Sequence, residues 1–198
     1  MTVTQISWFN SSKAYIADPA LVNDPAQRLK GINGVQSLYV AFEIEHPKVA
    51  YIVTIWGNYD DYISAVEEPA YVVALDTLKP LLDGTPQDIE SVFIDFTTTP
   101  VEALAAPVSE IVITELKPGE TEKDVVILDD VIAASGVTLG NHWGHVHGKP
   151  DEYGLFIGWE SVQSHAEAAR KGLLAEVIKK SEKTLKYSKI ANGKFREI

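Results

Sequence analysis

The histidines of this chain gather in its second half, where they could carry proton-transfer chemistry. Three of the five lie in one short run, Asn141-His-Trp-Gly-His-Val-His147, and a fourth is His165. Imidazole titrates near neutral pH and can pass a proton in either direction. We therefore predict that His145 and His165 are catalytic acid or base groups.

The spacing inside the run shows which side chains could act together. The run is expected to be a β-strand, and the alternation of a strand places every second residue on the same face. One face would then carry Asn141, Trp143, His145 and His147. Asn141, Trp143 and His147 are predicted to bind substrate, together with Trp159 from the next expected strand.

Two other interpretations of the histidines stay open at this point. Two histidines of a strand could hold one metal ion with His165 as a third ligand, although no Asp or Glu stands at an obvious ligand spacing. Alternatively, the run is an exposed polar strand end, and His165, which lies on the apolar stripe of its helix, is a hydrogen-bonded core residue. Trp159 would then be a core aromatic.

An internal repeat organises the elements around these residues. The segment Val3-Thr-Gln-Ile6 returns as Val108-Ser-Glu-Ile111, at an offset of 105 residues. An apolar run that ends in Trp56 returns as a run that ends in Trp159, at an offset of 103. Two matches in the same order predict a duplicated unit of about 100 residues.

The repeat predicts the division of the chain and its fold class. We expect a first half over residues 1–99, a linker over 100–106 and a second half with the histidines over 107–198. Each half reads strand, helix, strand, strand, helix, strand, which is the ferredoxin-like βαββαβ motif. One such unit leaves an apolar sheet face bare. The predicted fold is therefore α+β, with two ferredoxin-like units packed sheet to sheet as an intramolecular barrel.

Local signals place the elements of the second half. Thr121 with Asp124 predicts a capped helix start, and Gly148-Lys-Pro-Asp151 predicts the turn of a hairpin. Ser161 is expected to cap one helix that continues through Val177. In the first half, Pro25 is expected to interrupt the first helix.

The stretch Phe156-Ile-Gly-Trp-Glu-Ser-Val-Gln-Ser-His165 resembles a signature of the dimeric α+β barrel superfamily. The most similar group is the antibiotic-biosynthesis-monooxygenase-like and stress-responsive barrel proteins, and tandem chains of this length resemble fungal proteins of that superfamily. The resemblance implies a ligand between the sheet and the helices of one unit, near Trp159 and His165. The first half departs from the signature, because Trp56-Gly-Asn-Tyr59 replaces Trp-Glu-Ser-Val and Tyr62 stands where His165 would be. Its pocket should therefore differ chemically.

The resemblance also implies a range of functions. Relatives include cofactor-free monooxygenases, polyketide cyclases, haem enzymes and proteins without a known reaction. The leading hypothesis is an enzyme of specialised metabolism that acts on an apolar aromatic or polyketide-like substrate by histidine-mediated proton transfer, without a cofactor. The alternatives are a non-catalytic ligand-binding or stress-type barrel and a haem- or metal-binding barrel.

Composition limits the partners of the chain. Its 198 residues include 17 Lys and Arg against 28 Asp and Glu, a net charge of −11, and no Cys. The absence of Cys excludes disulfide scaffolds and thiolate zinc sites, and the charge repels nucleic acid and anionic lipid. Apolar runs are too short to span a membrane. We expect a cytoplasmic protein whose partner is a small apolar or aromatic molecule, and a homodimer remains open.

Overall fold

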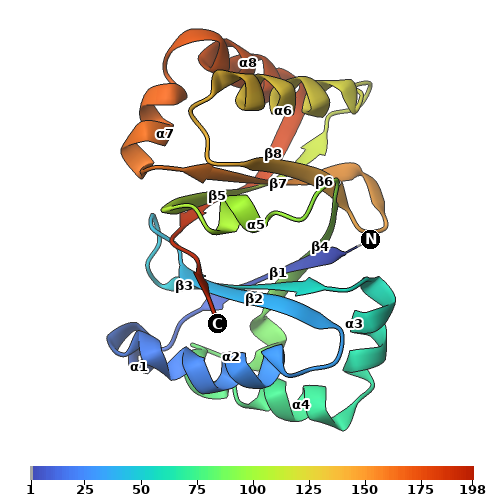
Figure 1. Cartoon of the computed structure of the whole chain (residues 1–198), viewed down its shortest axis with the longest axis vertical. Coiled ribbons are helices and arrows are strands. Elements are labelled where there is room, and N and C mark those ends of the chain that lie inside the picture. The colour runs from blue at the N-terminus through green and yellow to red at the C-terminus, as the bar shows by residue number, and fades with distance from the viewer. Residues whose placement is uncertain (1) are drawn as a thin grey trace. The chain divides into compact units, whose positions relative to one another are not determined.

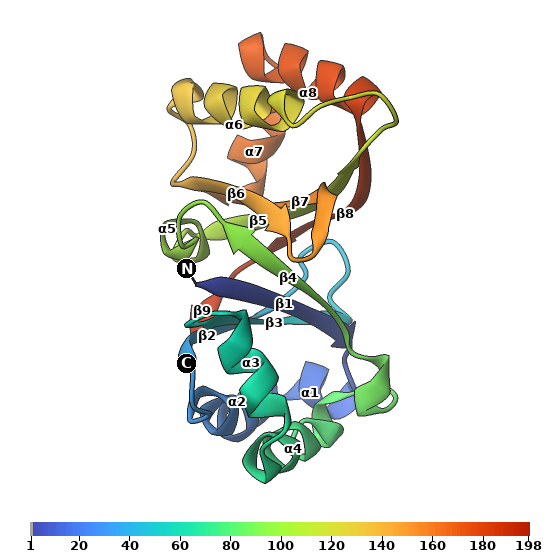
Figure 2. The same cartoon turned by 90° about the vertical axis from the view of Figure 1, so that its right-hand side faces the viewer.

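A computed structural model describes residues 2–198, which form two units (Figure 1). The first unit comprises the described residues up to Asp95 together with Arg196–Ile198, and the second comprises Phe96–Phe195. The short helix α5 (Val101–Leu104) lies in the segment expected as a linker and belongs to the second unit. In each unit helices cover one face of an antiparallel sheet, and only α5 of the second unit lies away from that face, as Figures 1 and 2 show.

The first unit has the strand order β4-β1-β3-β2-β9. Its strands are β1 (Val3–Asn10), β2 (Val35–Phe42), β3 (Val49–Trp56), β4 (Glu90–Phe96) and β9 (Arg196–Glu197). Its helices are α1 (Lys13–Ala17), η1 (Pro19–Val22), α2 (Asn23–Lys30), α3 (Tyr59–Val66), α4 (Pro69–Asp76), η2 (Lys79–Leu81) and η3 (Pro86–Asp88).

The second unit has the strand order β8-β5-β7-β6. Its strands are β5 (Val108–Leu116), β6 (Asn141–Val146), β7 (Lys149–Trp159) and β8 (Leu185–Gly193). Besides α5, its helices are α6 (Lys123–Ser135), α7 (Val162–Ala168) and α8 (Gly172–Thr184). The predicted βαββαβ order is present in both units, with the helices divided into shorter pieces.

The two units are equivalent down to their strand register. Val3 pairs with Trp56 in the first unit, and Val108 pairs with Trp159 in the second. These are the residues that matched in the sequence repeat. Register fixes which side chains share a face, so each position of the β1–β3 pair has a defined counterpart in the β5–β7 pair.

Several local predictions need correction. Helix α6 begins at Lys123 with Glu122 as its cap, because the Thr121 carbonyl and not its hydroxyl accepts the Asp124 N–H. The helix after Ser161 breaks into α7 and α8, because the backbone is extended at Lys171 (φ −133°, ψ 151°) and Gly172 follows at φ +65°. Pro25 lies in the first turn of α2, where its missing N–H costs no hydrogen bond, and so does not interrupt that helix.

The hairpin of the second unit also turns earlier than expected. The turn consists of His147 and Gly148, because Gly148 accepts φ +75° and lets strand β7 begin at Lys149. The expected turn residues from Lys149 to Asp151 therefore lie in the strand. Within residues 2–198, no helix is long and apolar enough to cross a membrane.

His142 is a buried histidine of β6 that should make folding depend on pH. Its Nδ1 is 2.7 Å from the Thr98 hydroxyl, and its Nε2 has no hydrogen-bond partner within the described chain. Burial lowers the pKa of His142 below its ordinary 6.5, although Glu102 and Asp129 oppose the shift. Between the lowered and the ordinary pKa, the unfolded chain binds the proton more readily than the folded one. This contribution to stability is therefore complete above about pH 6.5 and is lost as the pH falls.

We expect the urea midpoint of the protein to decrease from pH 7.5 to pH 5.5, and to decrease less in His142→Gln. Glutamine keeps a polar partner for Thr98 but cannot take up the proton. Equal decreases in both proteins would show that His142 does not contribute.

Candidate active site

A cavity of about 270 Å³ lies in the second unit between its sheet and helices α6, α7 and α8. We call it the Trp159 pocket. Its volume is close to the roughly 300 Å³ at which small-molecule sites begin. Most of its wall is apolar, with Val112, Leu128, Ile132, Leu155, Ile157, Leu174, Ile178 and Ile190, and its polar side chains are Glu110, His165, Glu182 and Tyr187.

Three of the lining residues form one cluster. The indole N–H of Trp159 donates to Glu110 Oε2 at 3.0 Å. His165 Nε2 lies 3.4 Å from the same oxygen, and its ring stacks on the indole with centroids 4.6 Å apart and planes 20° from parallel. Glu110 is only 6% exposed, so both contacts help to offset the cost of burying a carboxylate.

Local sequence explains why these groups meet. Alternation along β5 directs Val108, Glu110 and Val112 to one face, and Val108 is the register partner of Trp159. Ser161 and Ser164 form a reciprocal capping box that starts α7 at Val162, three residues after β7 ends. His165 follows in the first turn of α7 and is therefore held over Trp159.

The Tyr187 phenol at the wall of the Trp159 pocket remains neutral near pH 7. Burial raises the pKa of Tyr187, and the nearby Glu182 and Glu110 carboxylates add to the rise, while a hydrogen bond with Ser181 at 2.6 Å opposes it. The Tyr187 phenol therefore keeps its proton. It donates this proton to Ser181, whose own hydroxyl donates to the Ile178 carbonyl, so the phenol oxygen can accept a hydrogen bond from a ligand in the pocket.

The arrangement of Glu110 and His165 suits general-base chemistry. A carboxylate beside one imidazole nitrogen orients the ring and stabilises the imidazolium formed when the ring takes up a proton. When Nε2 faces Glu110 as the N–H, Nδ1 is the remaining acceptor on the ring. The cluster is thus able to take a proton from an acidic group of a bound molecule.

The structure does not bring His145 into this pocket. His145 Nε2 lies 3.2 Å from Glu122, and its ring is 4.7 Å from the ring of Tyr153, its register partner on β7. Tyr153 precedes Trp159 by six residues of strand, or about 20 Å. His145 and Trp159 are therefore on the same sheet face but far apart along it.

Three other predicted binding residues, Asn141, Trp143 and His147, do not line the Trp159 pocket, although the register partner of Asn141, Ile157, does. Asn141 donates to the Asp129 carboxylate of α6 at 2.7 Å, and the Trp143 ring is 6.1 Å from that of Tyr153. His147 is half-buried in the β6–β7 turn. Across residues 2–198, no three His, Cys, Asp or Glu side chains are grouped as metal ligands.

Sequence reasoning missed Glu110 as a site residue. The signal was present in the repeat, where Glu110 corresponds to Gln5, and in the strand, where Glu110 stands between Val108 and Val112 on one face. In the first unit Gln5 does the equivalent work: its Oε1 accepts the Trp56 indole N–H at 3.0 Å.

Comparison with known proteins supports the fold. No family model and no curated protein matches the sequence. Solved structures match over nearly the whole chain, and the first is a provisionally named monooxygenase from Fusobacterium nucleatum, 13% identical, with a TM-score of 0.71 over 99% of this chain and 93% of that one. The chain has the tandem dimeric α+β barrel fold.

Two further structures share this tandem barrel. A provisionally named monooxygenase from Lactobacillus acidophilus is 12% identical, with a TM-score of 0.65 over 97% of this chain and 92% of that one. An anthrone oxidase-like protein is 8% identical, with a TM-score of 0.67 over 99% of this chain and 93% of that one. The expected α+β class and the resemblance to monooxygenase-like barrels are confirmed at the level of fold, while the likeness to fungal proteins stays a prediction.

Proposed function

We propose that this tandem barrel is an enzyme that removes a proton from an apolar aromatic molecule in the Trp159 pocket, as the first step of a cofactor-free oxygenation or cyclisation. The observation that carries the proposal is the buried Glu110 carboxylate, shared between the Trp159 indole and His165. A buried carboxylate and an imidazole at the wall of an apolar cavity are typical of an acid–base site.

The first step moves one proton. The substrate O–H or acidic C–H bond breaks, the proton goes to the free nitrogen of His165, and the electron pair stays on the substrate. The imidazolium that results is balanced by Glu110 at 3.4 Å. The aromatic anion can then react with molecular oxygen or attack a carbonyl of its own chain. The first route is oxygenation and the second is cyclisation.

The walls of the pocket favour this step. Apolar side chains exclude water, which strengthens the attraction between the imidazolium and Glu110. The stack on Trp159 holds the His165 ring in one plane, so the base is fixed before the substrate binds. The printed names of the matched structures, monooxygenases and an anthrone oxidase-like protein, support an oxygenase of this class.

Anthrone under air is a direct probe of the proposal. Anthrone has an acidic C–H flanked by two rings, and its oxidation by one O₂ gives anthraquinone and one water, so atoms balance without a further reductant. We expect the protein to speed quinone formation and oxygen uptake in equal amounts. If the protein accelerates the oxidation neither of anthrone nor of any other phenolic or polyketide-like substrate, the proposed activity is wrong and the pocket only binds a ligand.

Glu110→Gln should separate the two tasks of the carboxylate. The glutamine can still accept the Trp159 N–H, as Gln5 does for Trp56 at 3.0 Å, so the fold should be retained. The charge that stabilises the imidazolium is lost, which is expected to lower kcat about 10- to 100-fold, the value of a charge-assisted interaction. An unchanged kcat would show that Glu110 is only a structural acceptor.

A further inference from the structure

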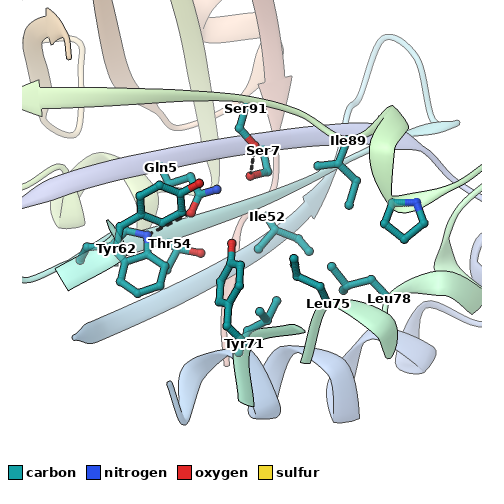
Figure 3. A pocket seen from close by; sticks show the side chains of 13 residues that line it. Gln5, Ser7, Ile52, Thr54, Tyr62, Tyr71, Leu75, Leu78, Ile89 and Ser91 are labelled. Atoms are coloured by element: carbon teal, nitrogen blue, oxygen red, sulfur yellow. Dashed lines mark hydrogen bonds between the residues drawn. The ribbon is translucent and has the colours of Figure 1, made fainter. Parts of the chain in front are cut away.

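The first unit has its own cavity at the equivalent position, with a volume of about 170 Å³. We call it the Tyr71 pocket. Figure 3 shows Tyr71 rising from helix α4 toward the sheet, with Ile52, Leu75 and Leu78 to one side of its ring. A cavity of about 150 Å³ can hold a benzene molecule, so this volume suits a ligand with a single ring.

The ionisable pair of the Trp159 pocket is replaced in the Tyr71 pocket by neutral groups. Gln5 stands where the second unit has Glu110, and Tyr62 stands where it has His165. The Tyr62 ring packs edge-on against Trp56 at 5.5 Å, in contrast to the parallel stack of His165. None of the described residues that line the Tyr71 pocket is Asp, Glu, Lys, Arg or His.

Apolar positions of the Trp159 pocket are replaced by hydroxyl groups. Ser7 and Ser91 are register partners, with their hydroxyls 2.8 Å apart (Figure 3). Their counterparts are Val112 and Ile190, which pair in the second sheet. Thr54 likewise replaces Ile157, two residues before the tryptophan. On equivalent positions, the Trp159 pocket therefore carries an ionisable pair in an apolar wall, whereas the Tyr71 pocket carries neutral hydroxyl groups.

The hydroxyl groups of the Tyr71 pocket stay neutral across the physiological range. Burial raises the pKa of Tyr71 to about 12, a rise that a hydrogen bond with Gln5 partly offsets. Burial also raises the pKa of Tyr62 above its ordinary value, and the Tyr59 phenol adds to the rise. A charged ligand would find no counter-charge there, and burying an unpaired charge is costly.

We propose that the Tyr71 pocket is a second binding site, distinct from the Trp159 pocket, for an uncharged single-ring phenol. Ser7, Ser91, Thr54 and Tyr71 offer hydroxyls to the ligand hydroxyls, and Ile52, Leu75 and Leu78 pack against its ring. The site binds without proton transfer, and its affinity is independent of pH between about 5.5 and 8.

Calorimetric titration with resorcinol, an uncharged phenol with two hydroxyls, tests the site. Matched blocking variants exist, because Thr54 and Ile157 are equivalent: Thr54→Phe fills the Tyr71 pocket, and Ile157→Phe fills the Trp159 pocket. We expect resorcinol binding to survive in Ile157→Phe, to weaken at least 10-fold in Thr54→Phe, and to keep the same affinity at pH 5.5 and pH 8. Benzoate, a single ring with a charge, should bind at least 10-fold more weakly than resorcinol.

A second variant with a smaller change in side-chain volume tests the site if Thr54→Phe does not fold. The double change Ser7→Val with Ser91→Ile introduces the apolar pair of the second unit and leaves neither hydroxyl without its partner. We expect it to weaken resorcinol binding about 2- to 10-fold, with an unchanged circular dichroism spectrum.

The site would be refuted by any of four results. The first is that 10 mM resorcinol does not bind the unmodified chain, and the second is full binding to folded Thr54→Phe or to the double variant. The third is a resorcinol affinity that changes between pH 5.5 and pH 8. The fourth is that benzoate binds as tightly as resorcinol. Each leaves the proposal for the Trp159 pocket intact, because anthrone turnover measures that pocket alone.

Discussion

Replacing His165 by alanine is expected to lower the rate of anthrone oxidation by two to four orders of magnitude, the usual contribution of a general base. The expectation follows from geometry: His165 lies 3.4 Å from the buried Glu110 and is stacked on Trp159 at the wall of the cavity. His165→Gln should lose as much, because an amide fills the space but cannot take up the proton. Stopped-flow measurement of anthraquinone absorbance gives both rates.

His145→Ala distinguishes this site from one that uses both histidines. His145 pairs with Glu122 about 20 Å along the sheet from Trp159, so we expect its removal to change kcat less than 3-fold. A decrease of kcat in His145→Ala as large as that in His165→Ala would contradict the proposed role of the Trp159 pocket. Full activity in both His165 variants would do the same.

The largest expected effect on stability comes from Gly158→Ala in strand β7. A Cβ at this position would lie 2.4 Å from the Leu139 carbonyl oxygen and 2.9 Å from the Ala106 Cβ. The Leu139 segment cannot withdraw easily, because the Leu139 N–H donates to the Gly158 carbonyl and the Gly158 N–H donates to that of Gly140, both at 2.8 Å. We expect a loss of about 3 kcal/mol in the free energy of unfolding, at the upper end for overpacking.

Gly31→Ala is the matched control for that experiment. The new Cβ would meet only backbone oxygens at 3.4 and 3.5 Å, and φ is −76°, which any residue adopts. The free energy of unfolding, measured in urea, should therefore change by less than about 1 kcal/mol, and any change should be stabilising. Similar midpoints for the two alanine variants would show that the Leu139 segment moves aside.

Periodicity and repetition predicted most of the fold. Val3 matched Val108 and Trp56 matched Trp159 between the two halves of the sequence. In the structure Val3 pairs with Trp56, and Val108 pairs with Trp159. The repeat was visible because the same strand pair requires the same residue types in both units. Element boundaries were less predictable where a single residue decides them. The helix that follows Ser161 is divided at Lys171 and Gly172, where only the glycine is a breaking signal that the sequence offers.

The site was predicted only in part, for a geometric reason. Alternation places His145 and Trp159 on the same sheet face but gives no position along the strands, which depends on the hairpin register of His145 with Tyr153. Glu110 was overlooked because a carboxylate in a strand is usually solvated. Its burial depends on Trp159 and His165, which approach it only in the folded chain.

Strand β9 has a consequence for the order of events during synthesis. Arg196 and Glu197 pair with β2, the Ile198 N–H donates to the Leu38 carbonyl, and the Arg196 guanidinium donates to Asn23 at 2.9 Å. A ribosome makes these residues after all of the second unit. The first unit therefore exposes the outer edge of β2 throughout synthesis of the second unit, until residues 196–198 cover that edge.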